Sequence, residues 1–412
     1  MRKFKNTYTM ILLAVLLSVA SADAQFLYFD NNDIDIVKSE IKNDDSGIKA
    51  IADKMKMMAD YILDKDPVTL TSSHAPNSLG SINDYYSESP YWWPDPINPD
   101  GEYIRKDGQR NPERFLDHKK LFAKMYAAVT TLGISSYLFN DERYASKAEE
   151  FIEAWFVNPR TRMNPNMEFA QIIKNKPVIR GVGIIETHNL VKLVEAFNFL
   201  NASGYLRKES FENTQKWFSE YLNWMLKSEF GVDEKDRGNN HSSWWAAQAA
   251  AYSFFIGDKS ALEDIYQYSK SFLIENQIEG NGQQPLEEAR TLSLSYYTFN
   301  LNALSTISAV LKNYNMDLFN YKNKNGGSII GAIDYLIPYL LNKQNWDKEQ
   351  IKPAEEDAPL FLGLAGLQLN NEFYLKTYET LYRDQKKEQY LPFDDPFEYL
   401  MDMVVITKLN KK

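Results

Sequence analysis

The sequence predicts an all-α protein built from a succession of helix hairpins in a single domain. From about residue 115 to residue 408, apolar residues recur at three- and four-residue spacing, which is the period of one helix face. Short connections between these segments favour antiparallel pairs. No convincing run of alternating strand residues occurs, and no repeat of fixed period indicates a TPR or HEAT array. A dozen or so such helices can stack as a solenoid or curve into an α/α toroid.

Residues 1–24 have the organisation of a secretory signal peptide. A basic start is followed by an apolar run over residues 10–20 and by a small-x-small site ending at Ala24, after which we expect cleavage. The run is too short to anchor the chain across a bilayer, and no cysteine follows it to carry a lipid. We therefore expect a periplasmic or secreted protein without a membrane anchor, whose folded domain covers residues 25–412.

Composition excludes several classes of protein. The chain has no cysteine, which rules out disulfides, zinc–thiolate sites and thiol nucleophiles, and no cofactor or metal motif stands out. A formal net charge of −10 argues against general nucleic-acid binding, although a locally basic cleft can still bind an anionic substrate. Aromatic residues make up 14% of the chain, which suits carbohydrate binding, while core packing explains most of them.

The helices are expected in the following order. Residues 34–63 have helical spacing with a break near residues 44–47, and Asp141 and Asp258 are suitable caps for two later helices. No low-complexity linker divides the chain, which favours one domain. The later helices are expected near residues 115–139, 142–157, 183–202, 208–228, 241–256, 259–276, 286–313, 328–342, 355–368, 371–384 and 396–408.

Two long polar loops interrupt the helices. Residues 65–113 contain seven prolines and the aromatic run Tyr91-Trp92-Trp93, and residues 157–182 form a second loop. A long ordered loop in a compact domain usually has a function. The aromatic loop either packs on the domain as a plug or forms one wall of a substrate cleft, and the two interpretations are compatible.

Two segments carry residues suited to chemistry. Asn239, Asn240 and His241 begin an apolar helix, where capping is the simpler explanation of an asparagine. In the expected helix 286–313, Arg290 and Tyr297 are seven residues apart and share a face, with Tyr296 within reach of it.

Structural explanations exist for the same residues. Arg290 could simply pair with Glu287 one turn away, and a tyrosine in a long helix belongs more often to the core or the surface. His188, just beyond the second loop, could be an ordinary core histidine.

An arginine, an asparagine, a histidine and a tyrosine together suit β-elimination from a uronic acid. The C5 proton can be removed once the neighbouring carboxylate is neutralised, since the developing charge is then stabilised. A tyrosine can take this proton and return one to the departing O4, because both lie on one face in mannuronate. Free tyrosine has a pKa of about 10 and therefore needs nearby positive charge, which Arg290 could supply.

The sequence resembles the alginate lyase superfamily of polysaccharide lyases, over roughly residues 71–310. The resemblance implies an α/α-toroid catalytic domain with long loops over the cleft, here without an appended β-sandwich. The matching segments are SPYWWPDP, NPDGEYIRKDGQRNPE, RMNPNMEFAQ, RGVGIIETH, NNHSSWWAAQ and QPLEEARTLSLSYYTFNLNAL.

The resemblance also implies roles for individual residues. The family's Asn-His pair falls on Asn240 and His241, its arginine on Arg290, and its catalytic tyrosine on Tyr296 or Tyr297, of which we favour Tyr296. His188 stands where relatives often have arginine. Further substrate contacts are expected from His188, Arg180, Tyr91, Trp92, Trp93, Asn166, Gln171 and Trp244.

The expected partner is an anionic polysaccharide, a β-1,4-linked polyuronate, most readily mannuronate-rich alginate. Glucuronan or another glucuronate polymer is the close alternative. An α/α-barrel glycoside hydrolase is a second hypothesis, with Asp95 and Glu287 or Glu288 as its paired carboxyl groups. A non-catalytic glycan-binding protein that uses Trp92, Trp93 and Trp244 is the third.

Overall fold

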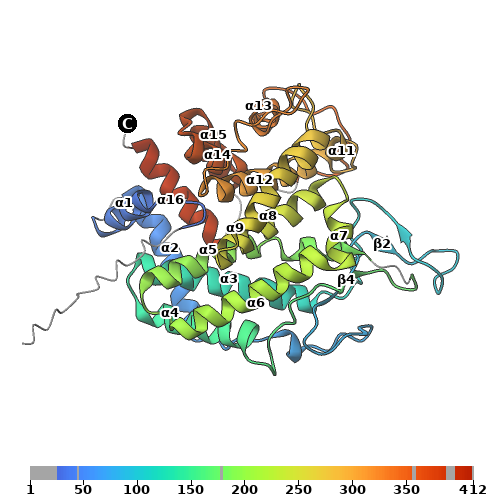
Figure 1. The fold of residues 1–412 in the computed structure, drawn as a ribbon, viewed down its shortest axis with the longest axis horizontal. Helices are drawn as coiled ribbons and strands as arrows, with labels where there is room; N and C mark the ends of the chain where they lie inside the picture. The colour runs from blue at the N-terminus through green and yellow to red at the C-terminus, as the bar shows by residue number, and fades with distance from the viewer. Residues whose placement is uncertain (1–25, 44–45, 177–179, 355–358, 387–394, 411–412) are drawn as a thin grey trace, which may run out of the picture.

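The structure is a computed structural model that describes residues 26–43, 46–176, 180–354, 359–386 and 395–410. The expected signal peptide, residues 1–24, lies outside the described residues. The helices form an α/α toroid, as predicted (Figure 1). In the part of the chain that the structure describes, no helix combines the length and the apolar character needed to cross a membrane.

Six of the described helices form an inner ring in which each contacts the next and the last returns to the first. Their residues are apolar or small on all sides, because they pack both against each other and against an outer layer. In α8, for example, almost every residue from Asn240 to Phe255 is buried. The inner helices are α3 (Asp117–Leu138), α5 (Leu190–Ser203), α8 (Asn240–Ile256), α12 (Ser293–Lys312), α14 (Leu360–Leu369) and α16 (Pro396–Asn410).

The outer helices are amphipathic, since only one face of each meets the ring. In α4, the buried residues Tyr144, Ala145, Ala148, Phe151 and Ile152 lie on a single stripe. The outer helices are α2 (Ser46–Leu63), α4 (Glu142–Ile152), α6 (Lys208–Lys227), α9 (Lys259–Tyr268), α13 (Ile329–Leu340) and α15 (Glu372–Lys386), and α1 (Asn31–Lys42) packs on α2 and α16.

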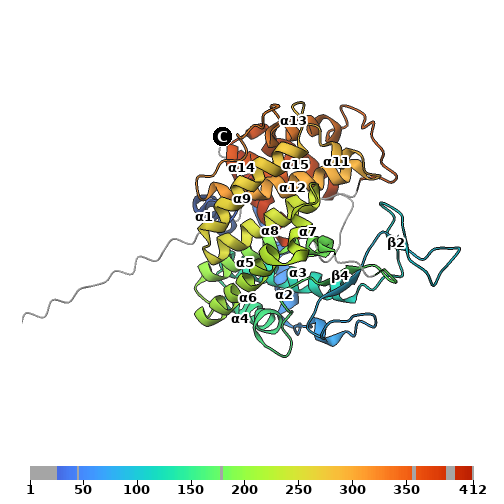
Figure 2. The same cartoon turned by 45° about the vertical axis from the view of Figure 1, so that its right-hand side comes forward.

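Each inner helix before α16 is followed by an outer helix that returns, so the inner helices run in one direction and begin at the same end of the toroid. Five connections that lead from an outer to an inner helix lie at this end: residues 64–116, 158–189, 228–239, 278–292 and 341–359. Elements in four of these connections, β2, β4, α7 and α11, lie on one side of the molecule (Figures 1 and 2). The N-termini of the inner helices, which carry the positive ends of the helix dipoles, also lie at this end.

The long connections contain short elements that periodicity did not specify. Strand β1 (Tyr86–Glu88) pairs in parallel with β4 (Phe169–Ile172), and β2 (Trp92–Trp93) pairs antiparallel with β3 (Ile104–Arg105). The segment carrying β2 projects beyond the helices in both views (Figures 1 and 2). Helix α7 (Glu229–Lys235) and the 3₁₀ segment η3 (Gly181–Thr187) precede α8 and α5.

One predicted helix is broken. The expected helix 286–313 consists of the short α11 (Pro285–Glu288), a non-helical link and then α12. The link forms tertiary contacts instead of helical ones: the Thr291 carbonyl accepts a bond from the Ile351 amide at 2.9 Å, and Leu292 pairs with Gln350 as a β-bridge. The prediction that Arg290 and Tyr297 share one helical face is therefore wrong.

The chain enters the fold through residues 26–29, all of which are buried. The amides of Leu27 and Tyr28 donate to the fully buried carboxyl group of Glu195 on α5, at 2.6 and 3.1 Å. Burial raises the pKa of Glu195 to about 7, against the opposing effect of these hydrogen bonds. Glu195 therefore connects the first described residues to the inner ring.

Candidate active site

The first turn of α8 presents the Asn-His pair. Asn239 is the cap, since its side-chain oxygen accepts from the His241 amide at 3.1 Å. Asn240 instead reaches out of the helix to α11, where its amide N–H and its side-chain Nδ2 each donate to a different oxygen of Glu287 at 2.7 Å. Capping thus explains Asn239 alone.

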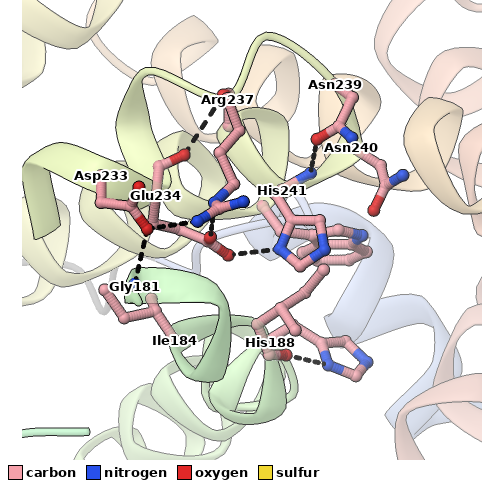
Figure 3. A network of polar contacts seen from close by, with 12 residues as sticks. Gly181, Ile184, His188, Asp233, Glu234, Arg237, Asn239, Asn240 and His241 are labelled. Atoms are coloured by element: carbon pink, nitrogen blue, oxygen red, sulfur yellow. Dashed lines mark hydrogen bonds and ion pairs between the residues drawn. The ribbon is translucent and has the colours of Figure 1, made fainter. Parts of the chain in front are cut away.

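His241 is held by a buried glutamate on α7. Its Nδ1 lies 2.7 Å from Oε1 of Glu234, whose side chain is 0% exposed, whereas the His241 side chain is 22% exposed. Because a carboxylate only accepts hydrogen bonds, Nδ1 carries the hydrogen and Nε2 faces the other way. Figure 3 shows His241 turned toward Glu234, with the Asn240 side chain projecting to the opposite side.

Helix α7 also anchors the segment that leads into α5. Asp233 accepts from the Gly181 amide at 2.7 Å, and Arg237 forms ion pairs with both Asp233 and Glu234 (Figure 3). A Cβ on Gly181 would lie only 2.0 Å from the Phe230 carbonyl oxygen, so this approach requires glycine. One short helix therefore positions both His241 and the segment after Arg180.

Arg290 lies in the link before α12 and forms an ion pair with Asp107 of the aromatic loop. Its Nε and Nη2 donate to the two oxygens of Asp107 at 3.1 and 2.9 Å, and Thr291 donates to Asp107 at 3.1 Å. Burial alone would raise the pKa of Asp107, but Arg290 outweighs this and lowers it to about 2. Gly108, with φ +71°, allows the loop to approach Thr291 closely.

The two neighbouring tyrosines have different surroundings. The Arg290 guanidinium lies 3.8 Å from the ring centroid of Tyr296, whose hydroxyl is 2.8 Å from that of Tyr91. Tyr297 is fully buried, and its hydroxyl donates to the carbonyls of Gly282 and Ala332. Tyr296 therefore faces the aromatic loop, and Tyr297 faces the core.

The resting charge balance at Tyr296 differs from the expectation. Burial raises the pKa of Tyr296, Tyr91 adds to this rise, and Arg290 opposes it without reversing it. The negative charge of Asp107 also contributes to the raised pKa of Tyr296.

Glu287 connects the two halves of the site. Burial raises the pKa of its carboxyl group, and the hydrogen bonds from Asn240 and the charges of Arg290 and His241 oppose this rise. The Glu287 carboxyl group thus interacts with Asn240 and His241 at the start of α8 and with Arg290 in the link before α12. Hydrogen bonds and charges therefore link the segment of Asn240 and His241 to the segment of Glu287 and Arg290.

A cationic and aromatic surface borders the site on the projecting loop. Lys176 and the Arg180 guanidinium lie 5.3 and 5.9 Å from the centre of the Trp92 ring, and Arg180 donates to Ser89 at 2.9 Å. Burial and the nearby Arg237 lower the pKa of Arg180 to about 10, so it remains charged at neutral pH. Among the described residues, no carboxylate forms an ion pair with Arg180.

The other expected contact residues divide into surface and interior. Trp93 donates its ring N–H to the Gln109 carbonyl at 2.9 Å, which ties the loop together. Asn166 donates to Asp84 at 3.4 Å. Gln171 has a φ of +53°, and its amide donates to Ser87 at 2.8 Å while its side chain is partly exposed.

His188, which is partly exposed, lies against the buried Trp244. Trp244 is only 3% exposed, so its ring packs in the core instead of offering a face to a sugar. The His188 ring lies 4.9 Å from Trp244 and 5.4 Å from Phe299, and its Nδ1 donates to the Ile185 carbonyl at 2.8 Å. Burial lowers the pKa of His188 to about 4, so the ring is neutral at neutral pH.

Two contributors were not identified from the sequence. Glu234 lies seven residues before His241, and Asp107 lies 183 residues before Arg290, with no local pattern linking either pair. The carboxyl groups of the hydrolase hypothesis are all engaged: both Glu287 oxygens accept from Asn240, Glu288 accepts from Gln284 and Gln283, and Asp95 accepts from the Ile97 amide at 2.9 Å. Within the described ranges, no group of three or more His, Asp or Glu side chains is arranged to hold a metal ion.

Comparisons with known proteins agree with this geometry. The family model described as alginate lyase matches residues 69–346. An alginate lyase from Bacteroides ovatus is 30% identical, with 92% of this chain and 99% of that chain covered and a TM-score of 0.80. Alginate lyase A1-III from Sphingomonas species A1 is 16% identical, with 84% and 89% covered and a TM-score of 0.53, which shows the shared fold. No curated protein matches the chain.

Proposed function

Because this chain belongs to the alginate lyase family and is a polysaccharide lyase, we propose that it cleaves mannuronate-rich alginate by β-elimination. A substituted form of alginate lyase A1-III in complex with a tetrasaccharide has the same fold, at 15% identity and a TM-score of 0.55. The observation that carries the proposal is that Glu287 bonds to Asn240, interacts with the charges of His241 and Arg290, and so links them to Tyr296, on whose ring Arg290 stacks.

Asn240 and His241 neutralise the uronate carboxylate in this proposal. A side-chain amide has two hydrogens on nitrogen, so Asn240 can donate one to Glu287 and the second to the substrate. His241, anchored through Nδ1, offers Nε2 from the adjacent residue. These two groups stabilise the negative charge that develops on the carboxylate as the C5 proton leaves.

Tyr296 is the base and then the acid. Its phenolate oxygen takes the C5 proton, the electron pair forms the C4–C5 double bond, and the C4–O4 bond breaks. Tyr296 then returns the proton to O4, so that no proton is gained or lost. Arg290, stacked on the ring, and the Tyr91 hydroxyl are the groups that can stabilise the phenolate.

The bordering surface suits a neighbouring sugar of the same chain. The Trp92 ring offers an apolar face, and Arg180 and Lys176 lie beside it, with Lys176 also paired to Glu102 at 3.2 Å. A polyuronate has both features, an apolar sugar face and one carboxylate per residue. Trp92, Arg180 and Lys176 are therefore proposed to bind a sugar next to the cleaved bond, after export of the protein to the periplasm or the medium.

The test is product formation on polymannuronate, polyguluronate and glucuronan, followed by the near-ultraviolet absorbance of the unsaturated product. We expect the largest rate on polymannuronate and a loss of at least a thousandfold in Tyr296→Phe. Tyr297→Phe is the matched control, because it removes a buried hydroxyl that bonds to Gly282 and Ala332 and should retain activity per folded molecule. Absence of product on all three polymers would refute the function, and higher activity on glucuronan would change the substrate.

A further inference from the structure

Glu234 is a buried carboxylate whose two oxygens are unequally satisfied. One oxygen accepts from Nδ1 of His241 at 2.7 Å. The other, inside a side chain that is 0% exposed, has no hydrogen-bond donor among the described residues and lies 3.4 Å from Nε of Arg237. A buried and incompletely paired carboxylate costs stability, so its position beside the candidate site calls for a functional reason.

The proposed reaction places a requirement on His241. A neutral ring with its hydrogen on Nδ1 would present the bare lone pair of Nε2 to the substrate, which repels a carboxylate. Only the protonated ring can donate from Nε2 while Nδ1 stays bonded to Glu234. A negative group must therefore stabilise this protonated ring after it is partly removed from water.

The charges that face His241 identify this group. Helix α7 contributes Glu234 and Arg237, α11 contributes Glu287, and Arg180 precedes η3. Arg237 pairs more closely with Asp233 than with Glu234 (Figure 3), and Glu287 is engaged by Asn240. Glu234 is thus the carboxylate in direct contact with the ring.

On the basis of the proposed function, we infer that Glu234 is a positioning residue that keeps the hydrogen of His241 on Nδ1 and stabilises its protonated ring. The protonated ring then donates from Nε2 to the uronate carboxylate. Helix α7 holds Gly181 through Asp233 and His241 through Glu234. The same helix therefore sets the position of His241 relative to the segment after Arg180.

The inference is tested first without substrate. In protein labelled with ¹⁵N-histidine, the His241 ring is assigned by comparison with His241→Gln, and its protonation is followed against pH in the wild type and in Glu234→Gln. We expect hydrogen on Nδ1 in the neutral ring of the wild type, and protonation about one pH unit lower in Glu234→Gln. Glu195→Gln is the matched control, because it also replaces a fully buried glutamate but lies against Leu27 and Tyr28.

Kinetics provide the second readout. In Glu234→Gln, kcat/KM should fall about tenfold at pH values above the protonation of His241 and should be unchanged at pH values below it. Neutral His241 with hydrogen only on Nε2 in the wild type would overturn the inference even if the variant failed to fold. So would an unchanged titration and an unchanged profile in a folded Glu234→Gln. Absence of unsaturated product from the wild type would instead refute the proposed function, while the NMR result still tests the Glu234–His241 contact.

Discussion

Asp107→Asn separates the charge of Arg290 from the position of the aromatic loop. Asparagine keeps the shape of Asp107 and one acceptor oxygen for Arg290 and Thr291, but it removes the negative charge. With the charge of Arg290 uncompensated, the phenolate form of Tyr296 becomes more favourable. For two unit charges about 5 Å apart in a medium with an effective dielectric constant of about 40, Coulomb's law gives about 1–2 kcal/mol, which corresponds to about one pH unit.

The same substitution has a calculable effect on stability. The pKa of Asp107 falls from 3.8 to about 2 in the folded protein, which corresponds to about 2 kcal/mol before solvent screening and about 1 kcal/mol for a side chain that is 22% exposed. Because this folded-state pKa is lowered, the stabilisation is present above pH 3.8 and is lost as the pH falls through 2. Asp107→Asn should therefore lose about 1 kcal/mol at neutral pH.

The assay is the pH profile of kcat/KM on polymannuronate, with the free energy of unfolding measured in denaturant. We expect kcat/KM at neutral pH to rise by up to about tenfold in Asp107→Asn, because Tyr296 is almost wholly neutral there and its phenolate fraction grows as its pKa falls. Asp95→Asn is the matched control, since Asp95 lies on the same projecting loop but accepts from the Ile97 amide and not from Arg290. An unchanged kcat/KM at neutral pH in folded Asp107→Asn would refute the coupling of Asp107 and Arg290 to Tyr296.

Three further outcomes are expected. Trp92→Ala should raise KM about three- to tenfold with little change in kcat. Trp93→Ala should mainly destabilise the loop, because it removes the hydrogen bond to the Gln109 carbonyl. Steady-state kinetics on polymannuronate distinguish the two effects. The pKa of His188 is about 4 in the folded protein against 6.5 in the unfolded chain, so the free energy of unfolding should fall by less than about 3 kcal/mol as the pH drops from 6.5 to 4. Denaturant unfolding of His188→Gln over this pH range should lack that loss. The pKa of Glu195 is about 7 in the folded protein against 4.5 in the unfolded chain, so the free energy of unfolding should fall by about 3 kcal/mol as the pH rises from 4.5 through 7. Denaturant unfolding of Glu195→Gln should not show this dependence on pH.

Periodicity was sufficient for the long helices because their burial is local information. The inner helices are apolar all round and the outer ones are apolar on one stripe, so spacing alone located most of them to within a few residues. It failed at residues 289–292, where Thr291 and Leu292 bond to residues 350–351 instead of continuing the helix. It also missed α7, whose seven residues are too few for a periodic pattern.

In the candidate site, too, the sequence located the residues, and tertiary contacts decided how they are arranged. Resemblance placed Asn240, His241 and Arg290 on the chain, and the structure then separated Tyr296 from Tyr297 by burial. Adjacent residues on one helix point in directions about 100° apart, so a spacing of six or seven from Arg290 could not decide between them once the intervening helix was broken.

The sequence by itself determined an all-α chain of hairpins and the segments that carry the candidate chemistry, because helix period and motif are properties of neighbouring residues. Only the tertiary structure decided which carboxylates hold those segments: Glu234 for His241, Glu287 for Asn240 and Asp107 for Arg290. Each of these contacts depends on helices and loops meeting at the end where the inner helices begin. Ring closure brings them together, and no local pattern in the chain encodes it.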